Sequence, residues 1–339
     1  MHPILKLVAQ RLALGILLLF AASILIFAGT TILPGDVAQS ILGQSATPEA
    51  LANLREELGM NDSAFSRYFS WLGGVIQGDL GTALTNGRDI AESIGTRLSN
   101  TLFLAFCAAI IAVPLAIALG LLAVRYKDRW PDKLISAVTL TTISIPEFMI
   151  GYLLIFFLSI QLPLWINGME FLSEGVRSWM LSNLRFSSVA LINDSMTLIE
   201  KIKSITIPVM VLTLVVLAHM MRMTRAAILN VMQSAYIETA ELKGMSGLDV
   251  IRKHAFPNAI APIVNVVMLN LAYLVVGVVV VEVVFAYPGM GQYLVDHVAK
   301  RDVPVVQACG LIFAAVYIGL NLVADVVAIL ANPRLRHPK

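Results

Sequence analysis

The chain has 339 residues, of which 58% are hydrophobic and only 14% charged, and its mean hydropathy is +0.81. A soluble domain carries about 25% charged residues, so this composition excludes an ordinary soluble globular protein. The formal net charge of +2 gives no reason to expect a nucleic-acid partner, and both cysteines, Cys107 and Cys309, lie in apolar runs, which excludes a disulfide scaffold and a thiolate metal cluster.

Long apolar runs predict six membrane-spanning helices, because roughly 20 apolar residues cross a bilayer as one helix. We expect these spans at Leu12 to Leu33, Leu102 to Val124, Leu134 to Leu162, Ile205 to Met221, Ala259 to Ala286 and Val305 to Leu330. Pro114 and Pro146 predict kinks in the second and third spans, since proline removes a backbone hydrogen bond. The first run has basic flanks like a signal peptide, but it is long and has no clear cleavage site, so we expect a retained helix.

Six spans place both termini on one side of the membrane, and the charges indicate which side. If the termini are cytoplasmic, the cytoplasmic segments hold more than half of the Lys and Arg residues, although they are shorter than the outside segments. The positive-inside rule therefore predicts cytoplasmic N- and C-termini. We expect an all-α, six-span polytopic helical bundle in three parts: residues 1–101 with the first span and an extracytoplasmic helical loop, the five-helix core 102–330, and the tail 331–339.

The outside loop after the first span, residues 34–101, is longer than an ordinary connection and should have structure of its own. After a turn at Pro34 to Asp36, Thr47 is placed to cap a helix that starts at Pro48. Its apolar residues form one stripe, which consists of Leu51, Leu54 and Leu58.

A second amphipathic stretch in this loop runs from Phe65 to Ile76. We expect the loop to form a small helical cap over the extracytoplasmic mouth. A helix that lies on the lipid surface is the alternative. The other long outside loop, residues 163–204, contains no motif that indicates a role.

The polar segment 222–258 lies between spans four and five, on the predicted cytoplasmic side. Good helix formers run from Ala226 to Lys243, Gly244 offers a stop, Ser246 can cap a second short helix, and Pro257 should end that helix. Two helices at an angle would form a compact knob suited to docking into a groove on a partner. The alternative is a surface loop that only joins two spans.

The spacing Glu238-x-Ala240-x-x-x-Gly244, with His254-x-Phe256-Pro257 nine residues later, resembles the EAA loop of ABC importer permeases. The chain departs from that pattern at Thr239, and it has His254 and Phe256 where Ile and Leu are usual. The variant Thr239-Ala240-x-x-Lys243-Gly244 is similar to the same loop in the dipeptide/oligopeptide/nickel branch of these permeases. Three further blocks agree with that branch: PGD with TPEALANLREELG and GDLG, YPGMGQYLVDHVAKRDVPVVQ, and NLVADVVAILANPRLR.

The resemblance implies a type I ABC importer permease in the bacterial inner membrane. Its implied partners are a second homologous permease, two ATPase subunits, a periplasmic binding protein that delivers a peptide-like solute, and membrane lipid. The residues implied in coupling to the ATPases are Tyr236, Glu238, Thr239, Ala240, Lys243, Gly244, His254 and Pro257. The chain has no G-x-x-x-x-G-K-[ST] loop, so we expect ATP and Mg on the partner subunits, no catalytic residue, and no cofactor or metal on this chain.

Acids at membrane depth are candidates for a translocation pathway, because a charge costs a few kcal/mol there. Glu147 follows Pro146, and a broken helix beside a carboxylate could face a peptide amino group or another cation. The alternatives are an interhelical hydrogen bond and a simple placement at the membrane interface. Glu282 is a second candidate, although its position beside the Tyr287-Pro288-Gly289 turn favours an anchoring role.

Asp325, near the predicted cytoplasmic end of the last span, is expected to pair with Arg334 or Arg336, or to cap a partner helix. The three acids also allow a different function, an ion-coupled secondary transporter. Such carriers usually contain repeated halves, and residues 1–165 and 166–339 show no convincing match. A membrane-anchored scaffold without a transport role is the third hypothesis.

Overall fold

The structure is a computed structural model in which residues 3–32, 37–42, 46–57, 59, 61–193 and 195–331 are described. Within this part nearly all residues are helical, and there is one isolated bridge, between Thr82 and Asp89, but no strand. Six helices of the described part are long and apolar enough to cross a membrane: Val8–Ile32, Ile90–Arg125, Glu147–Gly168, Thr206–Met232, Gly247–Val284 and Val303–Val327. The predicted all-α, six-span fold class is confirmed.

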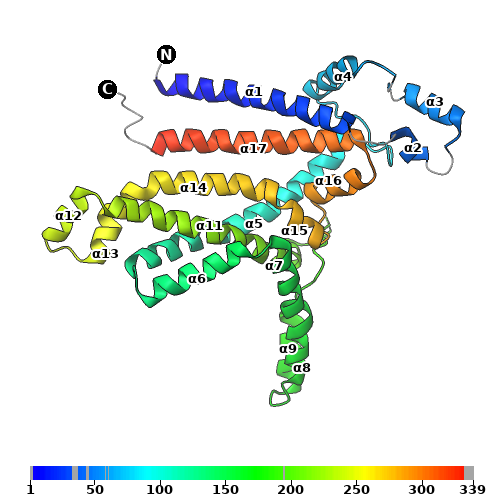
Figure 1. Cartoon of the computed structure of the whole chain (residues 1–339). Helices are drawn as coiled ribbons and strands as arrows, with labels where there is room; N and C mark the ends of the chain where they lie inside the picture. The colour runs from blue at the N-terminus through cyan, green and yellow to red at the C-terminus, as the bar shows by residue number, and fades with distance from the viewer. Residues whose placement is uncertain are drawn as a thin grey trace.

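Long helices packed side by side form the bundle (Figure 1). They are α1 (Pro3–Ile32), α5 (Ile90–Arg125), α11 (Thr206–Met232), α14 (Phe256–Gly277) and α17 (Val303–Ala331). α11 packs against α5 and α14, α14 against α17, and α17 against α1. The N-terminal end of α1 and the C-terminal end of α17 lie at the same end of the bundle as the short helices α12 and α13 (Figure 1). We call this end the knob end and the opposite end the far end.

α11 is the centre of the main core, and small residues let α5 approach it closely. A Cβ on Gly120 of α5 would lie 2.9 Å from Cγ2 of Thr224 and 3.4 Å from the carbonyl oxygen of Met221 on α11. The buried alanines of α5 recur at helical spacing, at Ala105, Ala108, Ala112, Ala116 and Ala123. Such a stripe favours close helix packing in membranes, where van der Waals contact drives association.

The predicted third span, Leu134 to Leu162, is wrong as a single kinked helix. α6 (Trp130–Ser144) ends before Pro146, and Ile145 is extended with φ −93° and ψ 129°. Proline disfavours the helical conformation of the residue before it, so the kink becomes a complete break.

A second helix starts after this break and leaves the bundle at a steep angle (Figure 1). It consists of α7 (Glu147–Leu154), the π-helical η2 (Ile155–Gln161) and α8 (Leu162–Gly168), and α9 (Glu174–Asn183) folds back against α8. We call residues 147–183 the arm. By contrast, α5 continues as a helix through Pro114.

Shorter helices collect at the far end: α2 (Val37–Leu42), α3 (Pro48–Glu57), α4 (Ala64–Ile76), α10 (Leu198–Ser204), α15 (Val279–Val284) and α16 (Met290–Ala299). The predicted N-terminal capping of α3 by Thr47 is confirmed, because the amide of Ala50 donates to Oγ1 of Thr47 at 3.2 Å and α3 begins at Pro48. α4 rests on α1 through Tyr68, whose hydroxyl is 2.8 Å from Oγ of Ser23. The turn at 34–36, Leu58 and the side chain of Leu54 lie outside the described residues.

Candidate functional site

A pair of short helices projects from the knob end of the bundle. The fourth span was predicted to end at Met221, but α11 continues as a helix to Met232. α12 (Ala235–Leu242) follows after a two-residue break. Gly244 then reverses the chain with φ +81°, a conformation that favours glycine. The amides of Gly244 and Met245 donate to the carbonyls of Glu241 and Ala240, at 2.9 and 3.3 Å, which is the Schellman pattern of a helix end. The predicted stop at Gly244 is confirmed.

The second helix of the pair is α13 (Gly247–Val250), and Ser246 caps it by accepting from the amide of Asp249 at 3.2 Å. Pro257 does not end this helix, contrary to the prediction. The chain passes through the π-helical η3 (Ile251–Ala255) into α14, and Pro257 lies in the first turn of α14. The missing N–H of a proline is tolerated in a first turn, and a π turn adjusts the register just before it. α13 is thereby joined directly to the fifth span.

The knob, residues 235–250, has a small apolar core that fixes it to the bundle. Ile237 and Ala240 of α12 pack with Val250 of α13, Ala255 of η3 and Ile228 of α11, and each is buried. Ala240 is therefore a packing residue inside the pair and does not present its side chain to a partner. This core includes residues of both α11 and α14, so α12 is packed against the two helices.

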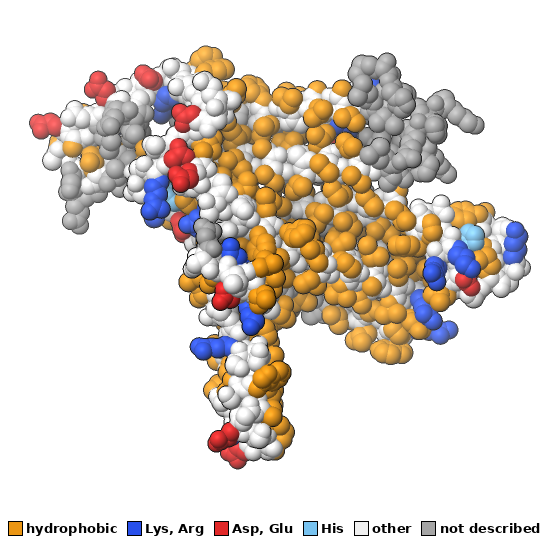
Figure 2. Space-filling model, turned by 180° about the vertical axis from the view of Figure 1, so that it is seen from behind, with side chains coloured by type: hydrophobic (Ala, Val, Ile, Leu, Met, Phe, Trp, Pro, Cys, Tyr) orange, Lys and Arg blue, Asp and Glu red, His pale blue; other side chains and the backbone are white. Residues whose placement is uncertain are grey.

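The outer face of the knob carries apolar side chains in solvent. Tyr236 is 44% exposed, Leu242 83% and Leu248 50%. Glu238, Thr239, Lys243 and Gly244 are exposed around them, as is Pro257, while His254 is half-buried. Lys and Arg side chains gather at this end (Figure 2). Exposed aromatic and aliphatic groups ringed by charges are typical of a surface that contacts another protein.

Beside the knob, a bidentate ion pair joins α6 to α11. Nε and Nη2 of Arg225 donate to the two carboxylate oxygens of Asp132, at 2.9 and 2.7 Å. The same carboxylate accepts from the amide of Asp128, which has φ +64°. This pair was not predicted from the sequence. The signal was an acid in the first turn of an apolar helix, but its partner lies 93 positions away and could not be identified without the fold.

Glu282 lies at the far end, fully buried. Its carboxylate accepts from Oγ1 of Thr101 at 2.6 Å and from the amides of Gly291 and Gln292 at 2.7 and 3.1 Å. A Cβ on Gly291 would lie 2.7 Å from Cα of Val279, so glycine is needed for this approach. We call these four residues, Glu282, Thr101, Gly291 and Gln292, the Glu282 cluster. Its contacts hold α5, α15 and α16 together and expose no oxygen of Glu282 to a passing solute.

Glu147 has a different environment. The hydroxyl of Tyr273 donates to Oε1 of Glu147 at 2.6 Å, which links the start of the arm to α14. Glu147 is half-buried, Tyr273 is 47% exposed, and Pro146 is exposed next to them. The pair is accessible, and one oxygen of the carboxylate makes no hydrogen bond to the described side chains. This arrangement can accept a hydrogen bond from a cationic or amino group.

Asp325 pairs with Arg11, with Nη1 of the arginine 3.0 Å from Oδ2. The pair links α17 to α1 at the knob end. The predicted partners, Arg334 and Arg336, lie outside the described residues. Asp325 thus has a structural contact between the first and last spans.

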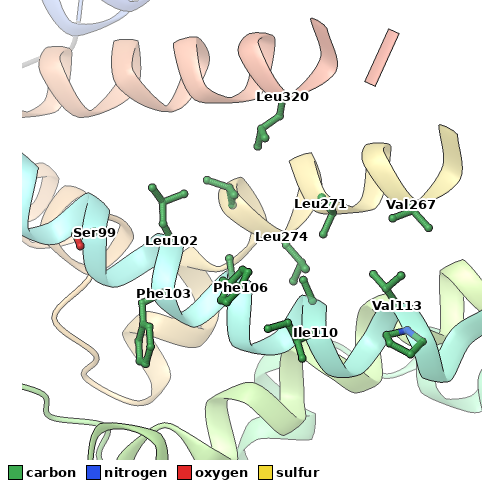
Figure 3. A pocket seen from close by; sticks show the side chains of 14 residues that line it. Ser99, Leu102, Phe103, Phe106, Ile110, Val113, Val267, Leu271, Leu274 and Leu320 are labelled. Carbon is green, nitrogen blue, oxygen red and sulfur yellow. The ribbon is translucent and has the colours of Figure 1, made fainter. Parts of the chain in front are cut away.

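A groove of about 910 Å³ lies between α5, α14 and α17 (Figure 3). Its walls include Leu102, Phe106 and Ile110 of α5, Leu274 of α14 and Leu320 of α17. Ser99 is the one lining residue with a polar side chain. The groove offers almost nothing to a polar solute, so the polar candidates for a pathway are Glu147 and Tyr273, next to Pro146.

Comparisons with known proteins agree with this architecture. Residues 112–337 match the family described as the binding-protein-dependent transport system inner membrane component, and residues 4–105 match the N-terminal family of such membrane components. The chain is 34% identical over 330 residues to the glutathione transport system permease protein GsiC of Escherichia coli O6:H1 (strain CFT073), which covers 97% of this chain and 98% of the relative.

The proteins of the same name from Escherichia coli strain K12 and Shigella flexneri serotype 5b (strain 8401) are each 33% identical, with the same coverage. The two family matches together include the knob and all of the six candidate spans except residues 106–111. The chain belongs to the binding-protein-dependent transport system inner membrane component family and is a multi-pass inner membrane permease subunit of an ABC importer.

Proposed function

We propose that this chain forms half of a translocation path for a peptide-like solute of the size of glutathione, and that its knob is the contact for an ATPase subunit. The relatives named above are glutathione transport permeases, which supports the solute class. The observation that carries the coupling role is the knob itself: a rigid projection with exposed Tyr236, Leu242 and Leu248 and a core continuous with two spans.

The remaining parts of the complex follow from what this chain needs. Without a phosphate-binding loop it depends on two ATPase subunits that hold ATP and Mg, and a second homologous permease completes the path. The concentration of Lys and Arg at the knob end supports a cytoplasmic knob and cytoplasmic termini. The far end then faces the periplasm, where a binding protein delivers the solute.

Energy is transmitted as rigid-body movement. When the ATPases close on ATP, they displace the knob, and its core moves α11 and α14 with it. The bidentate contact between Arg225 and Asp132 brings α6 along with α11. These helices then rock against the second permease and alternate access to the path between them.

The solute meets Glu147 on this path. A carboxylate at a broken helix, already oriented by Tyr273, attracts the amino group of a peptide. Pro146 maintains the break, because it lacks the amide hydrogen of a helical residue and disfavours the helical conformation of Ile145. Glu282 has no role in this path, since its oxygens are occupied inside the Glu282 cluster.

Gly244→Glu tests the coupling role, and Gly87→Glu is its matched control. Both glycines have positive φ, +81° and +67°, and a Cβ would meet nothing within 4 Å at either position. The backbone strain, about 1–2 kcal/mol, is therefore equal, but Gly87 lies in the loop at the far end. We expect both variants to insert into the membrane, and only Gly244→Glu to lose the ATPase subunits on co-purification and to lose uptake.

Retention of the ATPases and of uptake by Gly244→Glu would contradict the docking assignment. Equal loss in both variants would assign the effect to backbone strain and would contradict it as well. Uptake assays with the cognate binding protein and labelled glutathione or dipeptides test the solute class separately.

A further inference from the structure

Apart from Glu147 at its start, the arm is used by no coupling or transport step above. α7 packs on α11 and α15, and Ile155 and Leu158 of η2 pack against the main core, whereas the main contacts of α8 and α9 are with neighbouring elements of the arm. In Figure 1 the arm extends across the direction of the bundle helices. Its return segment is fixed to the far end, where the amide of Ala190 donates to the carbonyl of Phe285 at 2.8 Å.

Connectivity requires only one crossing between α5 and α11, so the arm need not add a crossing of its own. α5 runs from the far end to the knob end, and α11 starts again at the far end (Figure 1). The chain between them therefore crosses once from the knob end to the far end. α6 makes that crossing, because it lies beside both α5 and α11. α8 and α9 run out and back, so the arm adds no net crossing, although Glu147–Gly168 is long and apolar enough to span.

The length of α6 sets the depth at which the arm leaves the bundle. Its 15 residues rise about 22 Å, at about 1.5 Å per residue. The hydrocarbon core of a bilayer is about 30 Å thick. Trp130, 74% exposed at the start of α6, marks the interface at the knob end, where tryptophans are enriched. The break at Pro146 therefore falls within the far-end leaflet, near its outer boundary.

The two layers of the arm differ in chemistry. η2 and α8 contain no charged residue, and their exposed side chains include Phe156, Phe157, Leu164 and Trp165. Apart from Glu147 at the start of α7, the charges of the arm lie on the tip and on α9, at Glu170, Glu174 and Arg177. Figure 2 shows the apolar edge of the arm facing the apolar belt of the bundle, with the charged side chains along the other edge and at the tip. The apolar layer thus continues the surface that the spans present to lipid.

We propose that the arm lies in the plane of the membrane, with α7–α8 embedded in the far-end leaflet and α9 at the water interface. Covering a large apolar side chain stabilises it by about 1.5–3 kcal/mol, and lipid provides that cover for the whole row along α7–α8. A polar face over an apolar face, with tryptophans near the boundary, is the composition of an interfacial helix. The arm anchors the outer end of the third crossing in the bilayer, where α6 alone is too short to reach the surface.

Nitroxide labels on the assembled transporter in phosphatidylethanolamine and phosphatidylglycerol vesicles test this placement. The labelled variants are Phe157→Cys and Leu164→Cys on the apolar layer and Ser178→Cys on α9, made in a chain with Cys107→Ser and Cys309→Ala. We expect oxygen, which partitions into lipid, to relax the labels at 157 and 164 at least several-fold more than a water-soluble nickel chelate does. The label at 178 should show the opposite preference.

Two outcomes would overturn the proposal. Protection of positions 157 and 164 from both reagents would mean that a partner subunit covers the arm, and access of nickel to all three positions would place the arm in water. Tryptophan fluorescence provides a second measurement that needs no cysteine label. Trp165→Phe should remove emission that brominated lipids in the far-end leaflet quench. Trp130→Phe should remove emission that brominated lipids in the knob-end leaflet quench. This test is independent of the coupling role, since Gly244→Glu leaves the arm intact.

Discussion

The two ends of the bundle satisfy their polar groups in opposite ways. At the far end, buried acids are enclosed by donors of this same chain: Glu282 within its cluster, and Asp302, which accepts from the amide and hydroxyl of Thr85 at 3.0 and 2.9 Å. At the knob end, Asp132 is the buried acid among the described residues, and the surface of the knob leaves apolar and charged groups exposed. The Glu282 carboxylate is thus satisfied within this chain, although Oδ1 of Asp302 and side-chain atoms of Gln292, Tyr293 and His297 are buried at the same end without a hydrogen-bond partner among the described residues. The knob end instead exposes contact groups that a partner can cover.

This difference predicts where substitutions affect folding and where they affect assembly. Removing a polar group at the far end leaves a buried partner unpaired, which costs stability within this chain. Changing an exposed side chain of the knob leaves the fold intact and changes what the chain binds. Three substitutions, taken in order of decreasing expected effect on stability, test that division.

Glu282→Ala should have the largest effect. It leaves the buried amides of Gly291 and Gln292 without an acceptor, and each unpaired buried donor costs roughly 1–3 kcal/mol. We expect a loss of about 4 kcal/mol in the free energy of unfolding, measured as reduced thermal stability of the purified chain in detergent. Glu174→Gln, an exposed acid of the arm, is the control and should behave like the unmodified chain. Normal stability of Glu282→Ala would contradict a far end that is locked by its own hydrogen bonds.

Asp132→Asn should have an intermediate effect, because it weakens the contact that joins α6 to α11. Breaking a buried ion pair costs about 3–5 kcal/mol, but the Arg225 side chain is 27% exposed, so we expect about 2 kcal/mol. A double-mutant cycle with Arg225→Met isolates the pair energy. If α6 follows α11 during transport, uptake should fall while the ATPase subunits stay bound. If the effects of the two substitutions on the free energy of unfolding are additive, the Asp132–Arg225 pair contributes no interaction energy.

The parts of this structure that the sequence predicts are those determined by neighbouring residues. The Thr47 cap, the Gly244 stop and the Ser246 cap each depend on hydrogen bonds over a few positions, so local chemistry is enough. Apolar runs likewise predict spans, because length and composition decide whether a helix can cross a bilayer. Family motifs added the partners, which no local pattern could provide.

Other parts depend on contacts between distant residues. Glu282 pairs with Thr101 over 181 positions, and Glu147 with Tyr273 over 126, so only the assembled bundle shows which acid is enclosed and which is accessible. Pro146 predicts a break but not the direction of the next helix, because that direction depends on how α7 packs on α11 and α15. The coupling residues on the knob stay a prediction, since their partner is another chain.

Glu147→Gln should have the smallest effect on stability and a specific effect on transport. The carboxylate is half-buried and shares one described hydrogen bond, so the amide can keep the contact with Tyr273 while losing its charge. If Glu147 attracts the amino group of the solute, the concentration for half-maximal uptake should rise about tenfold or less, which corresponds to about 1.4 kcal/mol. Tyr273→Phe keeps the charge and should change uptake less. Both variants should retain the ATPase subunits, in contrast to Gly244→Glu, because neither lies on the knob. Unchanged uptake kinetics in Glu147→Gln would remove this residue from the path, and the accessible acid would then be an interhelical contact, like the enclosed acids of the far end.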